Sequence, residues 1–288
     1  MHRLRIYLSF VRFSHSVFAL PFALTGALLA LQAAPLPARA VWWRVVWIVV
    51  AMVAARSAAM GFNRLVDAEY DARNPRTAMR ELPAGRMTST EARLFIVGSV
   101  LVFLVCAFQL GVVCFVLAPV ALAIVFWYSL AKRVTHYTQA FLGLAMAVAP
   151  VGGWLAAGGR GLDPLPWILG LAIGTWVAGF DVLYACQDVD FDRREGLRSI
   201  PVKYGIAASL LISRGLHVVT VLALAAVGMR AGLGLMYAAG VALVAVLLVW
   251  EQSLVKADDL SQVKRAFDMN GWVGLLYFAA TAAAVYWR

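Results

Sequence analysis

Long apolar stretches without charge alternate along the chain with short segments that are rich in charge. Nine of these stretches are close to the length that crosses about 30 Å of hydrocarbon, and each predicts a membrane-spanning helix. They cover approximately residues 16–34, 41–60, 94–110, 113–130, 138–157, 165–186, 206–227, 233–250 and 271–287. The two stretches beside Gly111 are together too long for one crossing, so the pattern predicts two helices there.

The composition supports an all-α, polytopic membrane protein. Of the 288 residues, 63% are hydrophobic and only 14% are charged, and the mean hydropathy is +0.81. A soluble domain of this size cannot cover so much apolar surface with polar atoms. No Gly- or Ser-rich linker divides the chain, so we treat residues 1–288 as a single membrane domain.

Positive charge is distributed unevenly among the predicted loops. The net charge is +10, and most Arg and Lys residues lie in the loops that share a side with the N-terminus. The opposite loops hold few, namely Arg39, Arg44, Arg160, Arg230 and Arg288. The positive-inside rule therefore predicts a multi-pass protein of the cytoplasmic (inner) membrane, with the N-terminus and the charged loops in the cytoplasm, and no nucleic-acid partner. The first apolar run is long for a cleaved signal peptide, which favours a retained helix.

The first charged segment, "GFNRLVDAEYDARNPRTAMRELPAGR", follows the second predicted span. Asn63, Asp67 and Asp71 are spaced at i, i+4 and i+8, which places them on one face of a helix. Arg56 precedes Asn63 by seven residues and falls on the same face. This spacing predicts a polar stripe at the cytoplasmic end of that span.

The second charged segment, "DVLYACQDVDFDRREGLRS", follows the sixth predicted span. Asp181, Asp188 and Asp192 are spaced at i, i+7 and i+11, again on one helical face. Asp181 lies inside the apolar run "TWVAGFDVLYA", and acids within membrane spans are costly and usually functional. The two segments therefore predict two carboxylate stripes on the same side of the membrane.

Two facing carboxylate stripes repel each other unless positive charge lies between them. Oxygen ligands without His or Cys suit a hard cation such as Mg²⁺, which normally keeps water and substrate phosphate as further ligands. Basic residues follow both clusters: Arg76, Arg80, Lys132, Arg193, Arg194 and Arg198. One acidic pair is explained equally well by a solvated loop or by pairing with nearby Arg, but two such clusters favour a magnesium-diphosphate site beside an apolar chamber.

At these residues the sequence resembles the UbiA superfamily of intramembrane prenyltransferases. "NRLVDAEYD" and "DVDFD" are similar to the two aspartate motifs of that family, and "YSLAKR" is similar to its Tyr-x-x-x-Lys step. The likeness extends through "LGLAMAVAPVGGWLA" and "YACQDVDFDRREGLRSIPVKYG", and nine helices is the family's count. In "MRELPAG", Glu81 stands where the family commonly has Pro, which indicates a subgroup.

The resemblance implies nine helices around a central cavity that opens sideways to lipid. It implies Mg²⁺ held by Asp67, Asp71, Asp188 and Asp192 with help from Asn63, bridging the diphosphate of a polyprenyl diphosphate. The diphosphate oxygens would contact Arg76, Lys132 and Arg198. Tyr128 would line the reacting carbon, and Arg56 and Asp181 would lie near the acceptor or the diphosphate, so that these three are the expected catalytic residues.

The aromatic acceptor is predicted from a further resemblance. "SFVRFSHSVFALPFALTGALLA" is similar to the 4-hydroxybenzoate polyprenyltransferase branch, which implies prenylation of a 4-hydroxybenzoate-type acceptor in ubiquinone biosynthesis. Part of that branch is linked to menaquinone, so a futalosine-derived or naphthoate acceptor is the alternative. Arg12 and Arg56 are candidate cations for a benzoate carboxylate. An ion-coupled transporter is the alternative from another class, but it favours polar residues at the membrane midplane rather than at one edge.

Overall fold

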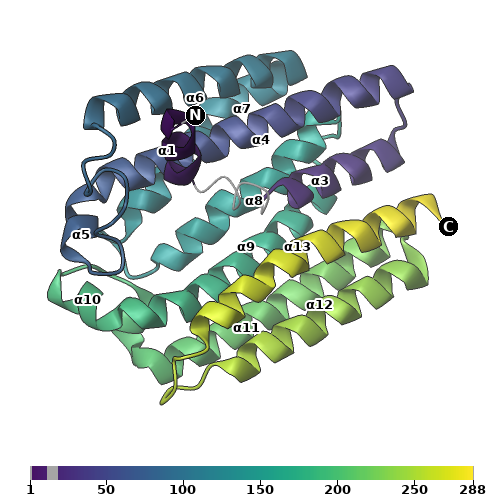
Figure 1. Ribbon diagram of the computed structural model, residues 1–288. Coiled ribbons are helices and arrows are strands. Elements are labelled where there is room, and N and C mark those ends of the chain that lie inside the picture. The colour runs from purple at the N-terminus through teal and green to yellow at the C-terminus, as the bar shows by residue number, and fades with distance from the viewer. Residues whose placement is uncertain (1, 12–18, 288) are drawn as a thin grey trace.

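The structure is a computed structural model that describes residues 2–11 and 19–287 (Figure 1). In this part of the chain the regular elements are helices, without a strand: α1 (His2–Phe10), α3 (Leu20–Ala33), α4 (Ala38–Val66), α5 (Ala68–Arg73), α6 (Ser89–Leu110), α7 (Val112–Ala131), α8 (Thr138–Ala156), α9 (Pro164–Ala185), a 3₁₀ turn (Cys186–Asp188), α10 (Val189–Arg194), α11 (Ile200–Ala231), α12 (Gly234–Leu254) and α13 (Val263–Tyr286). The predicted all-α class is confirmed.

Among the described residues, seven helices are long and apolar enough to cross a membrane, counting the α9 segment once with its extension to Arg194. They are α4, α6, α7, α8, α9, α11 and α12. Helix α3 has only 14 described residues, and its predicted span begins within residues 12–18, outside the described part. Helix α13 has 24 residues but is not among the seven. The protein is an integral membrane protein, and the count of nine spans stays a prediction.

The helix boundaries follow from local sequence signals. Gly111 has a positive φ of 125° and separates α6 from α7, which confirms the two helices predicted there. Thr88 and Glu91 form a reciprocal capping box that begins α6, and Asp163 caps α9 by accepting from the amide of Leu165. Helix α4 extends farther than the predicted 41–60 and carries Asn63 close to its C-terminal end.

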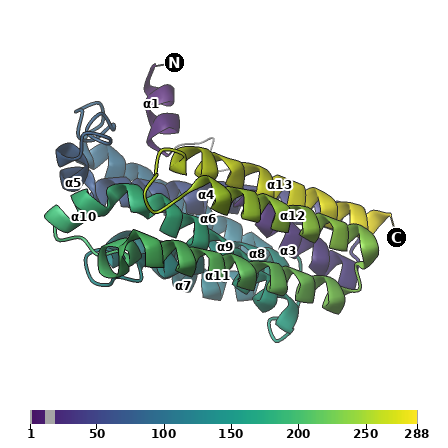
Figure 2. The ribbon, with the colours of Figure 1, turned by 90° about the horizontal axis from the view of Figure 1, so that it is seen from below.

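The long helices lie side by side in one bundle (Figure 1). The short helices α5 and α10 share one end of this bundle, and the C-terminus lies at the other end (Figures 1 and 2). Helix α1 projects from the side of the bundle, in the half that is nearer to α5 and α10 (Figures 1 and 2). The two charged segments, about 120 residues apart in sequence, therefore lie at the same end of the molecule, as the prediction of two neighbouring carboxylate stripes requires.

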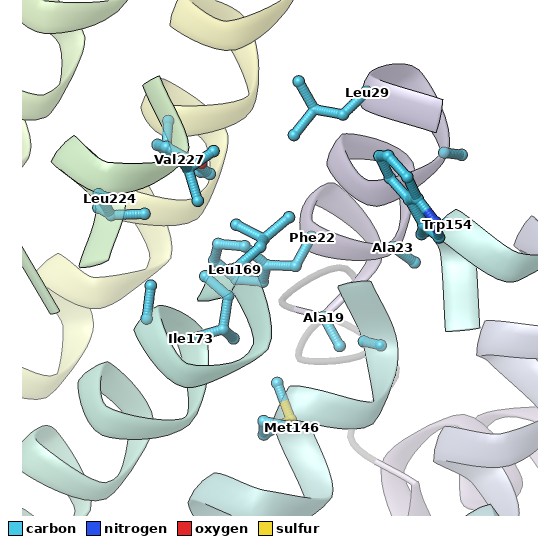
Figure 3. Close-up of a cluster of buried hydrophobic side chains, with 14 of the residues drawn as sticks. Ala19, Phe22, Ala23, Leu29, Met146, Trp154, Leu169, Ile173, Leu224 and Val227 are labelled. Atoms are coloured by element: carbon cyan, nitrogen blue, oxygen red, sulfur yellow. The ribbon is translucent and has the colours of Figure 1, made fainter. Parts of the chain in front are cut away.

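Small residues allow α3 and α8 to pack closely. A side chain at Gly153 would place its Cβ 1.9 Å from the carbonyl oxygen of Ala23, and one at Gly26 would lie 2.0 Å from that of Pro150. Close helix approach through small residues is the usual packing mode in membranes, where apolar burial gives no driving force between helices. Buried side chains around Phe22, Leu169 and Val227 fill the interior between α3, α9 and α11 (Figure 3).

Candidate functional site

The first acidic segment bends at Asp67, where α4 ends and α5 begins. The backbone amide of Asp67 donates to Asn63 at 3.0 Å, and that of Asp71 donates to Asp67 at 2.8 Å, so the i to i−4 hydrogen bonds continue across the bend. Asp67 and Asp71 are 3% and 7% exposed. Buried carboxylates need positive or hydrogen-bonding partners, and the structure supplies both.

Asp67 collects partners from two elements. Lys132 Nζ lies 2.7 Å from Asp67 Oδ2, and Arg133 Nη2 lies 3.3 Å from Oδ1. The amide Nδ2 of Asn63 donates to Oδ2 at 3.3 Å. The end of α7 is thereby joined to the end of α4 through this carboxylate. Asp71 has a different partner, because Arg80 Nη1 lies 2.8 Å from both of its oxygens.

Arg76 connects the two acidic segments directly. Its Nη2 lies 2.7 Å from Asp188 Oδ2, and its Nη1 donates to the hydroxyl of Tyr184 at 2.7 Å. Partial burial by itself lowers the pKa of Arg76, but the Asp188 carboxylate and the Tyr184 hydroxyl outweigh it, so the pKa is raised and the guanidinium stays charged. The predicted convergence of the two segments is thus present in the structure.

Asp192 and Arg198 lie on the other side of this cluster. Asp192 is hydrogen-bonded to the Ser199 side chain and lies within electrostatic range of Lys132 and Arg76. Arg198 donates its amide to the Lys132 carbonyl at 2.8 Å, and its guanidinium donates to the Val134 carbonyl. The structure therefore shows Arg198 bracing the loop after α7; its contact with diphosphate stays a prediction.

A cavity of about 650 Å³ extends from the charged end into the bundle. Its lining is almost entirely apolar, with Arg56 and Tyr128 among the few polar residues. Tyr128 lies within electrostatic range of Arg56, Asp67 and Asp181, so these predicted residues share one region. Several lining residues are solvent-accessible, namely Val120 (55%), Leu144 (48%) and Leu171 (53%), so the cavity is not sealed; its sideways opening to lipid stays a prediction.

Arg56 lines the cavity and has a side-chain nitrogen that lacks a hydrogen-bond partner in the described part of the chain. Its Nε is buried and has no hydrogen-bond partner among the described residues. A buried donor without a partner is costly, which makes it a natural binding point for an acceptor atom of a ligand. Arg12, the other predicted cation for a carboxylate, lies outside the described residues.

Several residues at the end of the bundle that carries the acidic segments had no individual role predicted from the sequence. Arg80 was only one of six basic neighbours, yet it holds Asp71, and Arg133 joins Lys132 on Asp67. Tyr70 lies beneath three cations, with its ring centre 5.0 Å from the guanidinium carbon of Arg73, 5.4 Å from that of Arg133 and 5.9 Å from Lys132 Nζ. Its position inside "NRLVDAEYD", next to Asp71, is the sequence signal that could have placed Tyr70 among these cations.

The acids of this cluster suit a hard cation. Among the described residues, no three His, Cys, Asp or Glu side chains gather tightly enough to enclose a metal. Mg²⁺ does not need such a cage, because it is commonly held by one or two carboxylates together with water and phosphate oxygens. The carboxylates of Asp67, Asp71 and Asp188 beside Lys132 and Arg76 fit a metal that arrives with a diphosphate.

Comparison with known proteins decides the family. The sequence profile described as the UbiA prenyltransferase family matches residues 19–280. The chain belongs to this family. It is 35% identical over 246 residues to a 4-hydroxybenzoate octaprenyltransferase of Cronobacter sakazakii, covering 82% of each chain. A 4-hydroxybenzoate octaprenyltransferase of Chromohalobacter salexigens is 32% identical over 240 residues, covering 83% of this chain and 79% of the relative.

Solved structures show the same fold. The apo structure of a UbiA homologue from Aeropyrum pernix K1 has a TM-score of 0.85 and 32% identity, covering 94% of this chain and 98% of that one. A UbiA homologue from Archaeoglobus fulgidus, solved with GPP and Mg²⁺, has a TM-score of 0.73 and 20% identity, covering 97% and 99%. The predictions of a UbiA-type membrane fold and of a prenyltransferase are confirmed, whereas the roles of individual site residues stay predictions.

Proposed function

We propose that this UbiA-family protein transfers a polyprenyl group from a polyprenyl diphosphate to the ring of 4-hydroxybenzoate, with Mg²⁺, in quinone biosynthesis. The observation that carries this proposal is the convergence of Asp67, Asp188, Lys132 and Arg76 near an apolar cavity, whose lining residue Tyr128 lies within electrostatic range of Asp67. The relatives from Cronobacter sakazakii and Chromohalobacter salexigens are named 4-hydroxybenzoate octaprenyltransferases, which supports this acceptor over a naphthoate or a futalosine-derived acid.

The donor's diphosphate would lie between the two acidic segments. Lys132 and Arg76 each already contact one of the segments, and both lie within electrostatic range of Asp192. Cations in this position stabilise the negative charge that develops on the leaving diphosphate when the allylic C–O bond breaks. Arg76 offers two donor groups in a fixed geometry, which suits phosphate oxygens better than a single ammonium does.

Mg²⁺ would be held by carboxylate oxygens of Asp67 and Asp71 on one side and of Asp188 and Asp192 on the other, with Asn63 assisting. When bound, it would supply Lewis-acid stabilisation of the diphosphate as it leaves. The protein itself orients three of these carboxylates, through Lys132 on Asp67, Arg80 on Asp71 and Arg76 on Asp188. The choice of metal is also supported by the A. fulgidus homologue, which was solved with Mg²⁺.

The acceptor would bind at the inner side of this cluster. The unpartnered Nε of Arg56 would contact the benzoate carboxylate, and Tyr128 would lie along the reacting carbon. Asp181 lies within electrostatic range of Tyr128 and would receive the ring proton after the new C–C bond has formed. The apolar lining excludes water, which would otherwise capture the allylic cation.

We also propose that the N-terminus and the charged end of the bundle face the cytoplasm. The charged loops carry most of the Arg and Lys residues, which favours that side of the membrane. A cysteine introduced at exposed Arg193, in a variant without native cysteines, would be labelled by an impermeant maleimide in inverted vesicles but not in intact cells. Labelling in intact cells would contradict this orientation.

The proposed reaction is tested with purified protein in lipid nanodiscs. Octaprenyl diphosphate and Mg²⁺ are supplied with 4-hydroxybenzoate, 1,4-dihydroxy-2-naphthoate or a futalosine-derived acid, and products are identified by mass spectrometry. We expect prenylated 4-hydroxybenzoate, its loss on addition of EDTA and its recovery with excess Mg²⁺. Asp67→Asn and Asp188→Asn should each abolish product, while Asp190→Asn, a matched exposed acid next to the second motif, should retain it. A prenylated product from only 1,4-dihydroxy-2-naphthoate, or from only the futalosine-derived acid, would identify that compound as the acceptor instead of 4-hydroxybenzoate.

A further inference from the structure

The cavity is long compared with the reacting groups at its mouth. Residues of α8 from Ala140 to Ala156 line it, which corresponds to about 24 Å along the helix at 1.5 Å per residue. Tyr128, near the end of α7, lies within electrostatic range of Asp67 and so marks the charged end. The part lined by the last turns of α8 lies far from this end and is lined by apolar residues.

Gly152 occupies this distant part. It is one of the residues that line the cavity, and a Cβ built at this position would meet nothing within 4 Å apart from its own helix and its chain neighbours. It is followed in the lining by Gly153, which differs, since its Cβ would clash with the Ala23 carbonyl oxygen at 1.9 Å. Gly153 is therefore small because α3 packs against it, whereas packing gives no reason for a glycine at position 152.

We infer that Gly152 determines the length of prenyl chain that the cavity accepts, by leaving its distant part open. This inference rests on the proposed prenyl transfer and adds a specificity-determining residue to it. The diphosphate fixes the head of the donor at the charged end, so each additional isoprene unit reaches farther along α8. A long tail must pass Gly152, and a short tail ends before it.

The space beside Gly152 makes the substitution informative. A Cβ there enters open space rather than neighbouring atoms, so we expect leucine or tryptophan to leave the helix packing intact and to occupy space that a long tail would use. Short donors bind nearer the charged end and lose no contact. The substitution is therefore expected to separate long donors from short ones rather than to reduce all activity together.

The experiment compares wild-type protein, Gly152→Leu and Gly152→Trp in nanodiscs. Geranyl, farnesyl, geranylgeranyl and octaprenyl diphosphates are supplied at saturating 4-hydroxybenzoate, and kcat/KM is measured for each donor. For the leucine variant we expect kcat/KM for octaprenyl diphosphate to fall by about tenfold or more, as occurs when a pocket loses room for a substrate group. Geranyl transfer should stay within about twofold of wild type, and the tryptophan variant should shift the preference further.

Gly98→Leu is the matched control, because a Cβ at Gly98 on α6 also meets nothing within 4 Å but does not line the cavity. It should leave the donor preference unchanged. Equal kcat/KM profiles for Gly152→Leu and wild type, or a parallel fall for every donor, would overturn the inference.

A measurement independent of turnover separates this inference from the proposed reaction. Unfolding temperature is recorded with Mg²⁺ and each donor, since a ligand that binds the folded state raises it. Octaprenyl diphosphate should stabilise Gly152→Leu less than wild type, whereas geranyl diphosphate should stabilise both equally. A wild-type protein that binds the donors but forms no product would contradict the proposed reaction alone, and the comparison of the two shifts would still decide the role of Gly152.

Discussion

Lys132 Nζ lies 2.7 Å from Asp67 Oδ2, so a cation at the end of α7 neutralises an acid at the end of α4. Asp67 is buried, with its side chain 5% exposed, whereas Lys132 is 30% exposed and reaches in from the rim. One contact therefore links the first acidic segment to the helix that carries Tyr128, and places an ammonium where the diphosphate would leave.

Replacing Lys132 with methionine should reduce kcat strongly. The ammonium is expected to stabilise charge that appears on the leaving diphosphate, and removal of one such group typically lowers kcat by roughly a hundredfold. Single-turnover kinetics with octaprenyl diphosphate measure this step. Arg133→Met is the matched control, since Arg133 contacts the same carboxylate at a longer 3.3 Å, and its effect should be clearly smaller. Equal losses in the two variants would show that both act only by neutralising Asp67.

The hydroxyl of Tyr184 should position Arg76 for the donor. It accepts from Arg76 Nη1 at 2.7 Å, while Asp188 accepts from Nη2 at the same distance. Tyr184→Phe removes this hydrogen bond and keeps the ring. The Arg76 side chain is 41% exposed, so water weakens this hydrogen bond. We therefore expect only a threefold to tenfold rise in the donor KM, a smaller effect than the roughly 1.5–3 kcal/mol of a hydrogen bond to a charged group would produce.

Steady-state kinetics with varied donor distinguish positioning from general damage in Tyr184→Phe. The kcat should change by less than about twofold, because the phenyl ring still packs against Phe267, whose ring centre lies 4.8 Å away. Arg76→Ala in the Tyr184→Phe background should add less than it does alone, since both act on one interaction. Additive effects of the two substitutions would place Tyr184 outside this role.

The sequence predicted the parts of this site that depend on helical periodicity. Asn63, Asp67 and Asp71 share a face because i to i−4 hydrogen bonds continue through the bend at Asp67, although the helix itself ends there. The division into two helices at Gly111 could be predicted because the apolar stretch around it is too long for one membrane crossing.

The partners of these acids were harder to predict, because they depend on side-chain reach between elements. Arg80 folds back nine residues to Asp71, and Arg133 reaches across from the turn after α7 to Asp67. Neither distance follows from a repeat in the sequence. The sequence showed that Glu81 in "MRELPAG" replaces the Pro that is common in the family. The contact that Glu81 makes could not be predicted, because the sequence pattern did not define the position of α1.

Glu81 should tie α1 to the site loop. Ser9 Oγ donates to Glu81 Oε1 at 2.5 Å, and Arg64 Nη1 on α4 lies 3.6 Å from Oε2, with both charged side chains 6% exposed. In a double-mutant cycle of Ser9→Ala and Glu81→Ala, we expect a coupling free energy of about 1 kcal/mol in detergent unfolding. A coupling near zero would mean that α1 is held by its other contacts, namely its apolar packing against Phe95 and the ion pair of Arg3 with Glu91.

A buried polar chain inside the bundle should make Asn270 more important for stability than its acidic neighbour Glu251. Asn270 accepts from Trp176 Nε1 at 2.8 Å and donates to Glu251 Oε1 at 2.7 Å, joining α9, α13 and α12. Asn270→Leu removes a partner from both groups at once, at a cost of about 1–3 kcal/mol for each. Glu251→Gln keeps an oxygen that accepts from Asn270, so its effect should be much smaller. Thermal unfolding in one detergent compares the two variants directly. If Glu251→Gln were the more destabilising, the carboxyl group of Glu251 rather than the Asn270 hydrogen bonds would hold these helices together.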